Sequence, residues 1–170
     1  MMNVNKLAAS ERGRLILIIN GALVALIGLL SGFGFVFEIL NSISVWPVSF
    51  EMSSDFPGSE RGWRVAHVAG VMNGLMLMIA GLVLVPIGAS LLAQRWIVWG
   101  LVYTGWGNTL FFHFANFSNN RGLSAGTTHF GEADWAGILG YLFGASTIPF
   151  TLCAFILMAR GAYLTLKRLN

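Results

Sequence analysis

Charged residues are scarce in this sequence: only 10% of its 170 residues are Asp, Glu, Lys or Arg, whereas 56% are hydrophobic. A soluble globular domain carries about 25% charged residues. So few charges would not cover a water-facing surface, which excludes a soluble protein and predicts an integral membrane protein. The net charge is only +3, and the basic residues flank apolar runs. This pattern indicates membrane topology, and no nucleic-acid partner is expected.

Cysteine and histidine are also scarce. The single cysteine, Cys153, lies inside an apolar run, so no intrachain disulfide is possible. The three histidines are His67, His113 and His129, and no two of them have the i, i+4 spacing of a paired metal site. A tetrahedral zinc site needs three or four protein ligands, and the acids of the predicted loops are not clustered. The sequence therefore gives little support to a zinc site.

Four long apolar segments dominate the chain. We predict one all-α domain over residues 1–170, a four-helix transmembrane bundle with spans at approximately 15–40, 63–92, 97–117 and 135–163. About 20 residues suffice for a helix to cross the hydrocarbon core of a membrane. We expect Pro86 to kink or end the second span, Arg95 and Trp96 to form a short turn before the third, and Pro149 to kink the fourth. Residues 41–62 are predicted to be a polar, turn-rich loop, and no strand is predicted anywhere.

The distribution of basic residues predicts the orientation of the bundle. Four spans bring both termini to the same side of the membrane. Seven of the ten basic residues belong to that side: Lys6, Arg12, Arg14, Arg95, Arg160, Lys167 and Arg168. Because basic residues are enriched in cytoplasmic loops, we expect a multi-pass protein of the inner (cytoplasmic) membrane with cytoplasmic termini.

The second span carries the most informative polar residues. At 3.6 residues per turn, His67, Gly70 and Gly74 lie on one stripe of the helix, and Asn73 flanks Gly70. An ionisable residue at membrane depth indicates a functional site, and two glycines beside it would leave room for a flat group. Histidine is the usual protein ligand of haem iron, and haem needs only one such ligand. Haem is thus favoured over zinc, while helix packing through two small residues remains an alternative explanation.

The third span carries a second polar face. Thr104, Asn108 and Phe112 are four residues apart, so their side chains point in roughly the same direction. A single asparagine in a span is explained by a hydrogen bond between helices. Two asparagines, a threonine and a histidine in one span favour the lining of a cavity.

These features coincide with a known family pattern. The sequence contains Phe56-Pro-Gly-Ser-x-x-Gly-Trp63, Ala66-His67, Asn73-Gly74, Gly105-Trp-x-Asn108, Asn116-Phe-Ser-x-Asn-Arg-Gly-Leu123 and Phe130-Gly-x-x-Asp134. In order, spacing and total length it resembles the styrene oxide isomerases, small four-span bacterial membrane enzymes. The resemblance covers nearly the whole chain.

The resemblance implies a haem b bound by one histidine, at the position of His67, in a homotrimer with haems between protomers. It also implies the rearrangement of a small apolar aryl epoxide to an aldehyde, with ferric iron as a Lewis acid and a lipid bilayer as the surroundings. Asn73 matches the asparagine of the family that faces the substrate. We therefore predict a site with His67 as metal ligand, Gly70 and Gly74 as cofactor contacts, and Asn73, Thr104, Asn108 and Phe112 as catalytic residues. A haem protein of the same fold with another substrate, or with an electron-transfer or sensing role, is the alternative.

Two positions depart from the family pattern. The family carries a tyrosine at the position of Phe112 and an aspartate at the position of Thr104. Loss of one hydrogen bond to a developing charge costs about 1.5–3 kcal/mol, or roughly one to two powers of ten in rate. Haem binding is expected to survive both changes, because neither residue is the ligand. The nearby His113 is a candidate for a substitute donor.

Overall fold

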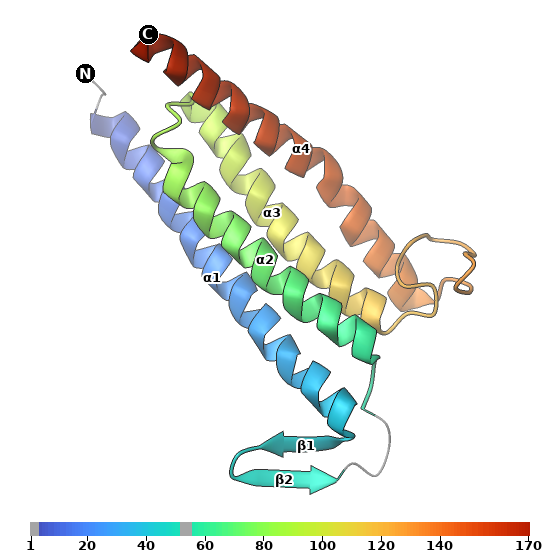
Figure 1. Ribbon diagram of the computed structural model, residues 1–170. Coiled ribbons are helices and arrows are strands. Elements are labelled where there is room, and N and C mark those ends of the chain that lie inside the picture. Colours follow the sequence, from blue (N-terminus) through green and yellow to red (C-terminus); the bar gives the residue numbers. More distant parts are fainter. Residues whose placement is uncertain (1–3, 52–55) are drawn as a thin grey trace.

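The computed structural model describes residues 4–51 and 56–170, and within these residues it is an up-and-down arrangement of four helices (Figure 1). The helices are α1 (Val4–Leu40), α2 (Glu60–Leu84), α3 (Leu91–Asn116) and α4 (Trp135–Leu169). Successive helices pack against each other, and α1 also contacts α3. Both termini and the α2–α3 turn lie at one end of the bundle, called here the terminal end. The α3–α4 loop lies at the other end, called here the loop end.

Length and hydropathy identify candidate membrane spans among the helices. By length and hydropathy, three of them qualify as membrane spans: 7–40 of α1, α2 and α4. Many large apolar side chains on these helices face outward, Leu26, Ile79 and Ile156 among them. The 26 residues of α3 extend about 39 Å, enough for a hydrocarbon core of about 30 Å. Its polar side chains lower its hydropathy, and they are used in contacts with the other helices.

The second helix is shorter than the sequence predicted. It ends at Leu84, and α3 begins at Leu91 with the hydroxyl of Ser90 accepting a hydrogen bond from the Ala93 backbone N–H at 3.3 Å. The predicted boundary at residue 92 and the predicted turn at Arg95 and Trp96 were therefore wrong, because both residues lie in the first turns of α3. Helix α2 ends just before Pro86, the residue expected to kink or end it because proline lacks the N–H that a helix needs. Pro149 lies inside a continuous α4.

The segment after α1 also differs from the prediction. Two short antiparallel strands, β1 (Ser42–Val45) and β2 (Val48–Glu51), form a hairpin in the expected polar loop. The Ser-Ile-Ser-Val and Val-Ser-Phe-Glu sequences alternate polar and apolar residues, the period of a strand, so this signal was present and overlooked. The predicted absence of strands was wrong for this segment.

The two ends of the bundle are packed differently. Leucines and isoleucines fill the core of the terminal half, with Leu17, Leu84, Ile97 and Leu101 fully buried. In the loop half, α1 and α2 meet through glycines, and aromatic rings cluster around Trp63. The histidine of the second span lies in this glycine-rich half.

Candidate functional site

His67 on α2 is half-buried, and its ring meets the backbone of α1. Its Nδ1 atom lies 2.9 Å from the carbonyl oxygen of Gly28. A carbonyl oxygen only accepts hydrogen bonds, so Nδ1 carries the hydrogen and the lone pair of the neutral ring is on Nε2. Among the described residues, no hydrogen bond to Nε2 is formed. A metal-binding histidine typically has this arrangement, one nitrogen fixed by a carbonyl and the other free to bind.

Glycines make this contact possible. A Cβ atom on Gly28 would lie 2.5 Å from the backbone nitrogen of Val71, and one on Gly32 would lie 2.9 Å from Nδ1 of His67. Real Cβ atoms do not approach so closely, so glycine at these two positions allows α1 to come within reach of the imidazole. Sequence reasoning did not single out Gly28 or Gly32.

Gly70 and Gly74 face α1. A Cβ on Gly70 would lie 2.6 Å from the Cα of Gly28, and one on Gly74 would lie 2.5 Å from both the Cβ of Ala25 and the carbonyl oxygen of Gly21. Both glycines therefore lie in the helix interface, as the packing alternative predicts, rather than beside an open space for a cofactor.

The other two histidines have different surroundings. In His113, Nδ1 lies 2.7 Å from the carbonyl oxygen of Thr109 and Nε2 lies 3.0 Å from the hydroxyl of Ser31 on α1. Both of its nitrogens are engaged, which does not favour the proposed substitute donor beside Phe112. His129 lies in the α3–α4 loop, next to Phe130. Within residues 4–51 and 56–170, no group of three or more His, Cys, Asp or Glu side chains is arranged to hold a metal ion.

The predicted polar residues form a hydrogen-bonded chain across three helices. The side-chain amide of Asn108 on α3 donates to Oδ1 of Asn73 on α2 at 3.3 Å. The hydroxyl of Thr147 on α4 lies 3.1 Å from Oδ1 of Asn108 and can donate to it. Asn73 and Asn108 are thus brought together, although they are 35 residues apart in the sequence.

Thr104 lies one turn from Asn108 and is almost completely buried, with 1% of its surface exposed. Its hydroxyl donates to the carbonyl oxygen of Gly100 at 2.8 Å and lies 2.8 Å from the hydroxyl of Thr151 on α4. Within the protein interior this threonine is satisfied by neutral partners. Neither of these two contacts involves a charged group.

Phe112 lines a groove of about 460 Å³ between α3 and α4. Polar lining comes from Asn108, Thr147 and Thr151, and aromatic lining from Phe111, Phe112 and Tyr141. The remaining lining residues are Gly122, Leu123, Gly144, Ala145, Ile148 and Leu152. The groove is therefore mainly apolar with one polar stripe, a combination typical of sites for small organic molecules.

The predicted site residues thus fall into two regions of the chain. His67 lies against α1, whereas Asn108 and Phe112 line the groove on the α3–α4 side. Asn73 is linked to this groove by its hydrogen bond with Asn108. Thr147 and Thr151 were not among the residues predicted from the sequence. Their i, i+4 spacing on α4 repeats the spacing of Thr104 and Asn108 on α3, so this polar stripe was visible in the sequence.

Most other residues of the recognised motifs stabilise the loop end. Oδ1 of Asn116 accepts from the backbone N–H of Ser59 at 3.0 Å, at the start of α2. Gly58 has a φ of +111°, and a Cβ there would meet the amide of Asn116. Asp134 accepts from the Asn119 N–H at 3.1 Å and from the Gly137 N–H at 2.7 Å, which fixes the start of α4. These motifs hold the helix ends around the site.

Comparison with known proteins agrees with the motif pattern. A family model described as styrene oxide isomerase matches residues 13–163. The chain is also 33% identical over 129 residues to a styrene-oxide isomerase of Pseudomonas fluorescens. That alignment covers 74% of this chain and 76% of the relative.

Proposed function

The chain belongs to the styrene oxide isomerase family, and on that premise we propose that it is a membrane-bound isomerase that uses haem b to convert an aryl epoxide to an aldehyde. In the proposed reaction the benzylic C–O bond of the epoxide opens and a hydrogen moves to the neighbouring carbon with its bonding electrons. The epoxide oxygen becomes the aldehyde oxygen. Substrate and product are isomers, so the reaction requires no redox partner.

The observation that carries the proposal is the hydrogen bond between Nδ1 of His67 and the carbonyl of Gly28. It leaves Nε2 with a lone pair available to iron, and it fixes the plane of the ring. A single imidazole is a sufficient protein ligand for haem, which supports haem as the group bound here. His67 would therefore be the residue that holds the haem iron, through Nε2.

Bound ferric haem would supply a Lewis acid that polarises the epoxide oxygen. The chain itself would orient the substrate and exclude water. The amides of Asn73 and Asn108 provide donors and acceptors inside the membrane, and the rings of Phe111 and Phe112 offer an apolar surface to an aryl group. Exclusion of water matters because water attack on the opened epoxide would give a diol.

We also propose a homotrimer in which protomers share each site. The two regions of the site support it: within one chain, His67 lies against α1 and the groove of Phe112 opens on the α3–α4 side. A neighbouring protomer that covers these faces would enclose the substrate. We further propose four spans in the inner membrane, with both termini in the cytoplasm. The seven basic residues of the terminal end support this orientation.

The proposal is tested with the full chain purified in detergent. Haem content is measured first, and an aryl epoxide such as styrene oxide is then added and the aldehyde quantified. We expect one haem per chain and an aldehyde product, both lost in His67→Ala and both retained in His129→Ala. Bound haem without aldehyde from any aryl epoxide would contradict the isomerase and favour another haem function.

A further inference from the structure

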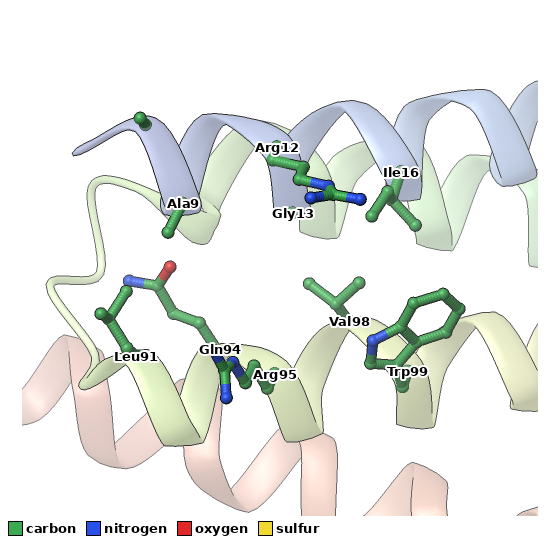
Figure 2. A pocket seen from close by; sticks show the side chains of 10 residues that line it. Ala9, Arg12, Gly13, Ile16, Leu91, Gln94, Arg95, Val98 and Trp99 are labelled. Atoms are coloured by element: carbon green, nitrogen blue, oxygen red, sulfur yellow. The ribbon is translucent and has the colours of Figure 1, made fainter. Parts of the chain in front are cut away.

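A second cavity, of about 490 Å³, lies at the terminal end of the bundle, whereas His67 lies in the loop half (Figure 2). It is formed between α1 and α3. The residues around it are Ala8, Ala9, Arg12, Gly13 and Ile16 of α1, and Leu91, Gln94, Arg95, Val98 and Trp99 of α3. Its volume is within the range of about 300–1,000 Å³ that is typical of small-molecule sites.

Two arginines flank this cavity without compensating acids. Arg12 comes from α1 and Arg95 from α3, and both are exposed. Over residues 4–51 and 56–170, neither guanidinium forms an ion pair. The nearby Glu11 is already paired with Arg14 at 3.4 Å. The cavity therefore has an excess of positive charge and fork-shaped donors, which favours a phosphate group.

Gln94 supplies a buried acceptor in the lining of the same cavity. Gln94 is only 5% exposed, and its amide nitrogen donates to the carbonyl oxygen of Ala89 at 3.0 Å. This bond fixes the orientation of the carboxamide, because the oxygen could not face another carbonyl oxygen. Oε1 is then buried without a donor among the described residues, and Figure 2 shows it directed toward Ala9 across the gap. An unmatched buried acceptor is costly, so a ligand with an O–H or N–H group would satisfy it.

The rest of the lining is apolar. Ile16, Val98 and Trp99 continue the cavity toward the middle of the helices, and Trp99 is 60% exposed on the outer face. A free phosphate ion would gain nothing from this surface. An amphiphile would place its polar group between the arginines and its chains along Val98 and Trp99.

We propose that this cavity binds an anionic glycerophospholipid whose headgroup carries a hydroxyl. The phosphodiester contacts Arg12 and Arg95, and the headgroup hydroxyl donates to Oε1 of Gln94. A zwitterionic lipid suits the site less well, because its ammonium group would be repelled by the two guanidinium groups. Basic pockets between transmembrane helices on the cytoplasmic side bind anionic lipid headgroups. The terminal end is the proposed cytoplasmic side of this protein.

The test is native mass spectrometry of the full chain, released from detergent and titrated with defined lipids. We expect phosphatidylglycerol to bind more tightly than phosphatidylcholine, and about fivefold more tightly than phosphatidylmethanol, which has the same charge but no hydroxyl. The double variant Arg12→Gln/Arg95→Gln should bind phosphatidylglycerol about 25-fold more weakly, roughly fivefold for each guanidinium. The matched control Arg160→Gln/Lys167→Gln removes two charges from α4 at the same end and should change binding less than threefold.

Three results would overturn the proposal. One is equal binding of phosphatidylglycerol and phosphatidylcholine. Another is unchanged phosphatidylglycerol binding in the Arg12/Arg95 double variant. The third is displacement of the lipid by millimolar inorganic phosphate, which would indicate a small-anion site. If the double variant does not fold, the unmodified chain still provides a test. Tighter binding of phosphatidylglycerol than of phosphatidylmethanol supports the proposal, and equal binding of the two overturns it.

Discussion

His67 and Gly28 are joined across the α1–α2 interface by a hydrogen bond of 2.9 Å from the imidazole Nδ1 to the backbone carbonyl oxygen. The bond depends on two close backbone approaches, because Gly28 itself lies against Gly70 and Val71. The histidine and the glycines of this region thus form one unit: the glycines bring the carbonyl near, and the carbonyl selects the tautomer of the ring.

The first prediction concerns Gly28. In Gly28→Ala the added Cβ would lie 2.5 Å from the Val71 nitrogen, so α1 and α2 must move apart. Overpacking of this kind costs about 1–3 kcal/mol, and the separation would also lengthen the bond to His67. We expect a lower midpoint in SDS-induced unfolding and weaker haem retention on gel filtration. Gly126→Ala is the control, since nothing lies within 4 Å of a Cβ there; equal behaviour of the two variants would contradict the packing argument.

The second prediction concerns the lining of the groove. Phe112→Tyr adds the hydroxyl that the resemblance to the family implies for this position. A hydrogen bond to developing charge is worth about 1.5–3 kcal/mol, so aldehyde formation should become roughly 10- to 100-fold faster. Phe111→Tyr provides the matched control, because Phe111 lines the same groove with its ring 4.9 Å from that of Phe112. Acceleration in both variants, or in neither, would show that position 112 has no special relation to the substrate oxygen.

A third prediction addresses the contact between Asn73 and Asn108. A double-mutant cycle with Asn73→Ala, Asn108→Ala and the double variant isolates the free energy of their interaction. We expect about 0.6 kcal/mol of coupling in unfolding titrations, the usual value for a hydrogen bond between membrane helices. Additive effects, with no coupling, would mean that the 3.3 Å contact contributes nothing to stability.

The fourth prediction concerns the start of α2. Asn116→Ala removes the acceptor of the Ser59 backbone N–H, so that one end of α2 loses a partner. Loss of one hydrogen bond of this kind costs about 0.5–1.5 kcal/mol, so Asn116→Ala should unfold at correspondingly lower SDS fractions. Asn119→Ala serves for comparison because only the Asn119 backbone N–H, not its side chain, takes part in a hydrogen bond with Asp134. A larger loss of stability in Asn119→Ala than in Asn116→Ala would contradict the stabilising role of the Asn116 side chain.

The sequence predicted the helices well because long apolar runs have few alternatives in a membrane. It predicted the α2–α3 boundary poorly: Arg95 and Trp96 looked like an interfacial turn, whereas Ser90 caps a helix that already contains them. The meeting of Asn73 with Asn108 was not predictable, since helical spacing gives the face of each helix but not its neighbour. The same limit explains why Gly70 and Gly74 were assigned to a cofactor: spacing alone does not distinguish an open face from one filled by α1.

The central claim is that His67 binds haem iron through Nε2, and the absorption spectrum of the purified chain tests it most directly. The unmodified chain and His129→Ala should show the same intense Soret band, with one haem per chain, whereas folded His67→Ala should show none. A colourless preparation of the folded unmodified chain, or a full Soret band in His67→Ala, would contradict the claim.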